Sequence, residues 1–163
     1  MTATDELLQH NAEYAAEFGK GELSSPPDKA LAVVTCMDAR IDLHRVLGLA
    51  EGDAHVIRNA GGVVTDDVVR SLTISQRLLK TTEVMLVMHT KCGMLGLVDE
   101  EVRASVQADS GMSPPWAFEG FPDLEHALLE GVAKLRASPF LPEKARIRGF
   151  VYDVETGRLR EVV

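Results

Sequence analysis

The sequence predicts an α/β fold with a mostly parallel central sheet flanked by helices. Two observations carry this prediction: short apolar runs typical of buried strands, and helical patterns lying between them. Strands that alternate with helices in this way favour parallel pairing with right-handed crossovers. The 163 residues show no internal repeat and no long linker, so we expect residues 1–163 to form a single domain.

Four strands are expected. Residues 31–36 form an apolar run without polar alternation, which is typical of a strand buried on both faces. The other runs are at residues 54–58, 83–89 and 147–153. The run at residues 54–58 is followed by the turn-like Asn59-Ala-Gly-Gly62. A further turn-like segment, residues 155–158, follows the last run.

The helices are expected between these runs. An N-terminal helix is marked by apolar residues up to Phe18 and could be stopped by Gly19. Thr65 is a candidate N-cap, followed by two aspartates that suit the positive end of a helix dipole. Apolar residues at four-residue spacing predict a helix over residues 94–106, and Pro122 is placed in the first turn of a last helix.

Composition excludes several classes of function. Seventeen Lys and Arg against twenty-five Asp and Glu give a net charge of −8, and no basic run is present, so nucleic-acid binding is not expected. The longest apolar stretches fall far short of the roughly 20 residues that cross a bilayer, so no membrane span is expected. The acidic N-terminal stretch differs from a secretory signal, and we expect a cytoplasmic protein.

The two cysteines of the chain are the main chemical signal. Cys36 ends the first expected strand, His89 ends the third, and Cys92 follows three residues later. In open α/β sheets, ligands gather at the carboxyl ends of the strands, where these three side chains would meet. Zn²⁺ takes thiolate and imidazole together, and three protein ligands leave one position free for catalysis. The alternative interpretation is that these are ordinary core residues.

Asp38 and Arg40 follow the first candidate ligand. If the chain stays extended past residue 36, residues 36, 38 and 40 project to one side. Arg40 would then pair with Asp38 and hold it ionised. The alternative is a surface ion pair worth under about 1 kcal/mol.

The combination Cys36-x-Asp38-x-Arg40, Arg58-Asn-Ala-Gly61 and His89-x-x-Cys92-Gly93 resembles the signature of the β-class carbonic anhydrases. The likeness covers about residues 30–96 and continues weakly at residues 149–153. The resemblance implies Cys36, His89 and Cys92 as zinc ligands, with Asp38 and Arg40 as a catalytic pair beside the open position. It also implies a homodimer or a dimer of dimers, with the N-terminal helix lying across the partner. Gly61 and Gly93 are candidate substrate-binding positions.

The resemblance implies reversible hydration of carbon dioxide to bicarbonate and a proton by zinc-bound hydroxide. Two thiolates cancel the charge of the ion, so Asp38 is expected to orient the hydroxide while Arg40 restrains it. Without that restraint, Asp38 would become a fourth metal ligand in a closed state. Two alternatives stay open: a zinc hydrolase of carbon disulfide or similar molecules, and a zinc- or bicarbonate-binding module without turnover. A thiol redox function is disfavoured because no Cys-x-x-Cys pair occurs.

Overall fold

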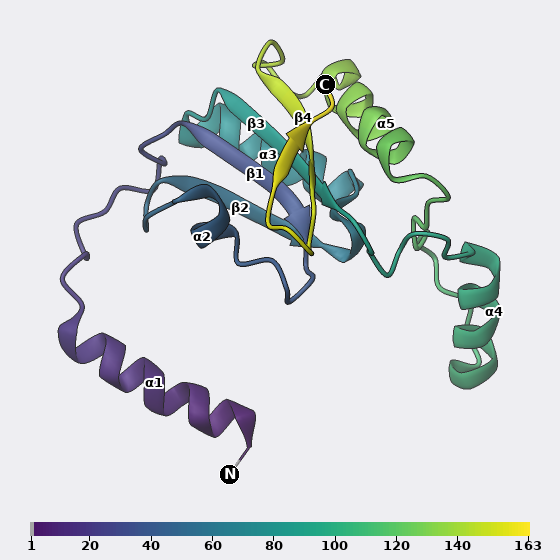
Figure 1. The fold of residues 1–163 in the computed structure, drawn as a ribbon, viewed down its shortest axis with the longest axis horizontal. Helices are drawn as coiled ribbons and strands as arrows, with labels where there is room; N and C mark the ends of the chain where they lie inside the picture. The colour runs from purple at the N-terminus through teal and green to yellow at the C-terminus, as the bar shows by residue number, and fades with distance from the viewer. Residues whose placement is uncertain (1) are drawn as a thin grey trace.

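A computed structural model of the chain describes residues 2–163 and has one five-stranded sheet at its centre (Figure 1). The strand order is β2-β1-β3-β4-β5. The first four strands pair in parallel, and β5 is antiparallel to β4. The strands are β1 (Leu31–Cys36), β2 (Ala54–Asn59), β3 (Glu83–His89), β4 (Ile147–Tyr152) and β5 (Leu159–Glu161). The expected mostly parallel α/β fold and all four expected strands are confirmed.

Helices connect the strands and cover both faces of the sheet. Figure 1 shows α3 behind the sheet, α5 beside β4 and the short α2 in front of the sheet. Because the chain moves from β1 out to the edge strand β2 and then back to β3, right-handed crossovers put α2 and α3 on opposite faces. The helices are α1 (Ala3–Glu17), α2 (Leu43–Leu47), α3 (Asp66–Leu79), α4 (Asp99–Ser110) and α5 (Leu124–Ala137), with a 3₁₀ turn η1 at Ala60–Gly62.

The core lies where the central strands meet α3 and α5. Val33 and Val34 in β1 and Leu86 in β3 are fully buried, and so are Leu72 of α3 and Leu128 of α5. This burial explains why β1 reads as a continuous apolar run, since helices or loops cover both of its faces. The packed core on both sides of β1 and β3 therefore holds the ends of these strands in place.

Two helix starts differ from the sequence prediction. The helix expected over residues 94–106 begins only at Asp99, because Gly96 takes a φ of +81° and Leu95 forms a parallel bridge with Phe121. Helix α5 begins at Leu124, where the side chain of Asp123 accepts a 2.7 Å hydrogen bond from the backbone N–H of His126. Pro122 thus precedes the N-cap and does not lie in the first turn. The Thr65 cap is confirmed, with a 3.3 Å bond from the Val68 N–H.

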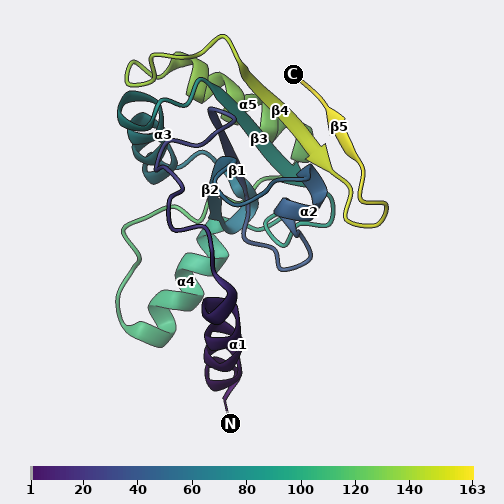
Figure 2. The same cartoon turned by 90° about the vertical axis from the view of Figure 1, so that its left-hand side faces the viewer.

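Two helices extend away from the sheet. Helices α1 and α4 both extend below the sheet, away from the body, and are far apart only along the horizontal of Figure 1 (Figures 1 and 2). Neither helix has a buried residue. Helix α1 ends at Glu17 with Phe18 as its C-cap, one residue before Gly19. Among residues 2–163, no helix combines the length and the apolarity that a bilayer crossing requires.

Candidate metal centre

Cys36, His89 and Cys92 come together at the carboxyl edge of the sheet. Cys36 is the last residue of β1 and His89 the last of its parallel neighbour β3, while Cys92 lies in the turn that follows. All three are buried, and one ligand atom from each lies within 4.8 Å of the others. In a tetrahedral zinc site, two sulfurs at about 2.3 Å from the ion are about 3.8 Å apart, so the group needs little adjustment.

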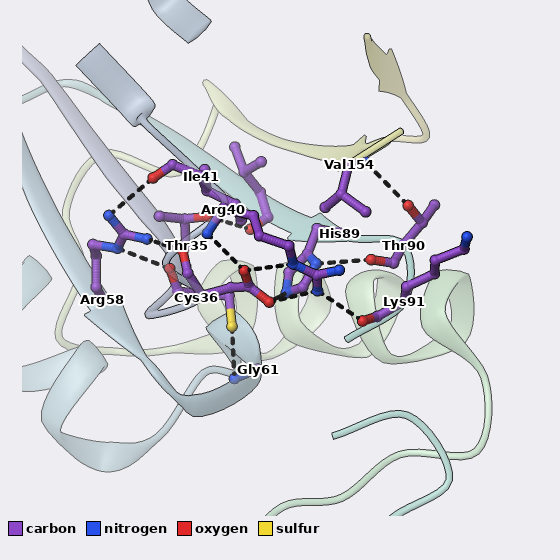
Figure 3. Close-up of polar contacts among 12 residues, drawn as sticks. Thr35, Cys36, Arg40, Ile41, Arg58, Gly61, His89, Thr90, Lys91 and Val154 are labelled. Carbon is purple, nitrogen blue, oxygen red and sulfur yellow. Dashed lines mark hydrogen bonds and ion pairs between the residues drawn. The ribbon is translucent and has the colours of Figure 1, made fainter. Parts of the chain in front are cut away.

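The protonation of His89 suits metal binding. Its Nδ1 lies 2.9 Å from the carbonyl oxygen of Thr90 (Figure 3). A carbonyl only accepts hydrogen bonds, so Nδ1 carries the proton and Nε2 has a bare lone pair. That Nε2 is buried and has no hydrogen-bond partner among the residues that the structure describes. An orphaned buried acceptor is costly unless a cation occupies the site, so the residues present fit a metal ion.

The two thiols point to the same conclusion. Burial raises the pKa of the Cys92 thiol, and the nearby Cys36 raises it further, while the backbone N–H of Met94 opposes this. The Gly61 N–H donates to the Cys36 sulfur at 3.3 Å (Figure 3). Two neighbouring buried thiolates are unfavourable alone, whereas a divalent cation between them offsets both charges. The donor set of two sulfurs and one imidazole is the kind that zinc prefers.

Asp38 and Arg40 form a close pair beside these ligands. The Arg40 side chain donates to both carboxylate oxygens, with Nε at 2.9 Å from Oδ1 and Nη2 at 2.6 Å from Oδ2. The Arg40 backbone N–H also donates to Oδ1 at 2.9 Å. The expected pairing is therefore confirmed, but the extended geometry proposed for it is wrong. The chain turns after Asp38, where the Ile41 N–H donates to the Asp38 carbonyl at 3.1 Å.

The electrostatics keep Asp38 ionised and near the ligands. Hydrogen bonds from the Arg40 side chain, followed by its backbone N–H, hold the pKa of Asp38 well below its usual range. Asp38 Oδ2 lies 3.8 Å from the free Nε2 of His89. Arg40 also donates to the Lys91 carbonyl at 2.9 Å (Figure 3). Lys91 lies in the turn between the candidate ligands His89 and Cys92. An acceptor carboxylate is thus held beside the ligand group.

The remaining histidines lie outside this group. His10, His44 and His126 are exposed. His55 lies near the start of β2, four residues before the end that neighbours Cys36. Its Nδ1 is 2.8 Å from the Ser75 hydroxyl and its Nε2 is 3.3 Å from the Ser25 carbonyl. These contacts indicate a structural role for His55.

Sequence reasoning missed two supports of the site: the Thr90 carbonyl that fixes His89, and the guanidinium of Arg58. Arg58 contacts three carbonyls of the loop that carries Asp38. The Arg58-Asn-Ala-Gly61 motif singles out Arg58 but not its role, and nothing in the sequence indicates the Thr90 contact, because all these acceptors are backbone atoms whose positions depend on the fold.

Comparison with known proteins decides the family. The carbonic anhydrase family model matches residues 31–159, a range that contains all three candidate ligands and the Asp38–Arg40 pair. The chain belongs to the β-carbonic anhydrase family. The family's cofactor is zinc, and the Cys36-His89-Cys92 group is able to hold it.

Individual relatives are similar to the chain over nearly its full length. The chain is 50% identical over 162 residues to beta-carbonic anhydrase 1 of Mycobacterium tuberculosis, covering 99% of both proteins. The crystal structure of carbonic anhydrase from Streptococcus mutans superposes with a TM-score of 0.93 at 41% identity, covering 100% of this chain and 99% of that one. The carbon disulfide hydrolase of an Acidianus strain is 37% identical, covering 96% of this chain and 87% of the relative.

Proposed function

We propose that this chain is a lyase that catalyses the reversible hydration of carbon dioxide to bicarbonate and a proton. The observation that carries the proposal is the bare, buried Nε2 of His89 facing two buried thiols beside an ionised Asp38. The 50% identity to a beta-carbonic anhydrase supports the choice of substrate. Zinc held by Cys36, His89 and Cys92 supplies the Lewis acidity that turns water into a nucleophile toward carbon dioxide.

Asp38 is assigned the role of orienting the reacting water, and Arg40 the role of holding Asp38 in place. Asp38 accepts a hydrogen bond from the reacting water and thereby orients the oxygen lone pair toward the substrate carbon. It remains an acceptor through the cycle because its pKa is held low by Arg40. Arg40 holds both carboxylate oxygens, which opposes a shift of Asp38 onto the metal. If the pair opens, Asp38, whose Oδ2 lies 3.8 Å from Nε2 of His89, would shift to become the fourth ligand of a closed state.

The two glycines have different surroundings. The Gly61 N–H donates to the Cys36 sulfur, so a substrate contact through the same N–H would weaken the support of that thiolate. Gly93 follows Cys92 directly, and a Cβ built at this position meets no atom within 4 Å. We assign Gly93 to the approach of the substrate. A Cβ at the buried Gly61 would lie 3.1 Å from the Met94 side chain and 3.3 Å from that of Phe121, so we assign Gly61 to the substrate site only as a support of the Cys36 thiolate.

Carbon dioxide hydration by the purified protein tests the proposal. Stopped-flow with a pH indicator is expected to show turnover that is lost on chelation and restored by zinc alone. Turnover is expected to rise from mild acid to mild alkali, because the water must lose a proton before it reacts. A zinc-loaded protein with no turnover, or with a flat or falling pH profile, would contradict the proposal.

Carbon disulfide hydrolysis is the second candidate. It is favoured by the 37% identity to a carbon disulfide hydrolase, which covers 96% of this chain. Release of hydrogen sulfide from carbon disulfide, measured beside carbon dioxide hydration on one zinc-loaded sample, separates the two. Faster turnover of carbon disulfide would reverse our assignment of the substrate.

We also propose that the chain associates as a homodimer or a dimer of dimers. Helix α1 has no buried residue and exposes Leu7 and Leu8, with 67% and 63% of their surface accessible. A second copy would bury this apolar face. Light scattering is expected to give at least twice the mass of one chain, and Leu7→Glu with Leu8→Glu is expected to lower it. A wild-type monomer at micromolar concentration would contradict this.

Residues 1–163 are further proposed to act as one cytoplasmic domain. One sheet with one core cluster supports a single domain, and two buried free cysteines that must remain thiolates suit a reducing compartment. A single cooperative unfolding transition and recovery in the cytoplasmic fraction are expected. Two separate unfolding transitions would contradict the single domain, and recovery from an oxidising compartment would contradict the cytoplasmic location.

A further inference from the structure

Arg58 makes three hydrogen bonds to one loop, all of them to backbone carbonyls. From the edge strand β2, Nε donates to the Cys36 carbonyl at 2.8 Å, Nη2 to the Asp38 carbonyl at 2.8 Å, and Nη1 to the Ile41 carbonyl at 3.2 Å (Figure 3). The planar guanidinium has its donors in a fixed fork, so three acceptors at once define one path for the backbone. Arg58 therefore fixes the course of residues 36–41.

This loop needs an attachment beyond the sheet. The pairing of β1 with β2 ends at Cys36 and Asn59, and the Met37 N–H adds one more bond to the Asn59 carbonyl at 2.8 Å. From Asp38 onward the chain turns out of the sheet. Arg58 extends the attachment from the end of β1 to Ile41, and so spans the segment that carries Asp38.

Arg40 cannot replace this attachment. It lies two residues from Asp38 in the same loop, so the Asp38–Arg40 bonds move with the loop as a unit. Only its bond to the Lys91 carbonyl reaches across to the other ligands. Arg58 holds the loop from a strand of the sheet, which is the frame that also places Cys36.

We propose that Arg58 is a positioning residue, which keeps the Asp38 carboxylate at its place beside the metal ligands by fixing the backbone of residues 36–41. This inference rests on the proposed function, because the position of Asp38 matters for orienting the reacting water. Arg58 does not touch the ligand atoms themselves. Its loss should therefore affect turnover more than zinc binding.

The test uses Arg58→Gln and Arg58→Lys in the full chain. Glutamine removes the charge and cannot reach three carbonyls, whereas lysine keeps the charge without the fork. Arg70→Gln is the matched control, since Arg70 is an exposed arginine on α3 whose ion pair is with Asp67 at 3.1 Å. We expect kcat of Arg58→Gln to fall about 10- to 100-fold, with KM within about twofold of wild type and one zinc per chain. Arg58→Lys should recover part of kcat, and the control should match wild type.

Hydrogen exchange of the metal-free proteins gives a readout independent of activity. The Ile41 amide, which donates to the Asp38 carbonyl, is expected to exchange at least about tenfold faster in Arg58→Gln, while amides of β3 keep their wild-type rates. Faster exchange across β3 as well would show a general loss of structure and overturn the positioning role.

Three further results would overturn the proposal: wild-type kcat in Arg58→Gln, an unchanged exchange rate at Ile41, or loss of zinc from both Arg58 variants. An inactive wild-type enzyme refutes the proposed function and with it the catalytic part of the role. In an active enzyme, a wild-type kcat in Arg58→Gln refutes the role of Arg58 alone. The two failures are therefore distinguishable.

Discussion

Gly62, in the 3₁₀ turn, lies close against the strands that carry Cys36 and His89. Its φ is +67°, and a Cβ there would lie 3.0 Å from the Cys36 nitrogen, 3.0 Å from the Thr35 carbonyl carbon and 3.3 Å from the Val87 carbonyl oxygen. These atoms belong to the backbones of β1 and β3, so no side-chain rotation relieves the contact. Gly62→Ala should therefore displace the strand end at Cys36.

Comparison with Gly48→Ala separates the two energetic costs of Gly62→Ala, the left-handed backbone and the crowding of the added Cβ. Gly48 has a φ of +64°, but a Cβ there meets no atom within 4 Å. The left-handed backbone costs an alanine about 1–2 kcal/mol at either position. Crowding adds about 1–3 kcal/mol at Gly62 only. The free energy of unfolding should thus fall by about 2–5 kcal/mol for Gly62→Ala and about 1–2 kcal/mol for Gly48→Ala.

Thermal unfolding of the metal-free proteins, followed by circular dichroism at one protein concentration, measures this difference. At about 3 °C per kcal/mol for a chain of this size, Tm should fall by about 6–15 °C for Gly62→Ala and about 3–6 °C for Gly48→Ala. Gly62→Ala should also bind zinc more weakly than wild type. Equal Tm values for the two variants, with equal zinc affinity, would refute the reasoning.

Three other predictions concern separate parts of the molecule. Arg40→Ala should keep its zinc by mass spectrometry but lose most turnover, because Asp38 loses its restraint; full turnover would contradict this. Leu86→Ala should lower the urea unfolding free energy by about 2–5 kcal/mol, since Leu86 is fully buried, and a loss under about 1 kcal/mol would count against the core. Backbone N–H groups of Gly120, Glu119 and Phe118 lower the pKa of Asp99, so hydrogen-exchange protection of these amides should persist above pH 4 and fade only in stronger acid. Protection already lost at pH 5 would contradict that assignment.

The sequence sufficed for the four parallel strands and for the convergence of Cys36, His89 and Cys92. Apolar runs such as residues 31–36 are distinctive because both faces of the strand are buried, and thiols in a chain with two cysteines stand out by chemistry. Parallel pairing then brings the strand ends to one edge. This is why the sequence predicts that Cys36, His89 and Cys92 lie together.

Short and strained segments were harder to predict. Helix α2 has five residues, with a side-chain cap at Asp42 and the left-handed Gly48 at its end, too few for a periodic pattern. The start of α4 is displaced by the bridge between Leu95 and Phe121, a tertiary contact that overrides apolar spacing. The three-residue strand β5 likewise depends on pairing with β4.

Zinc K-edge X-ray absorption of the purified protein tests the central claim most directly. The structure predicts two sulfur ligands at about 2.3 Å and light-atom ligands at about 2.0 Å, from His89 and the remaining position. One sulfur should be lost in Cys36→Ala and one in Cys92→Ala if either variant retains metal. A spectrum without sulfur, or with four sulfurs from a site shared between chains, would contradict the claim.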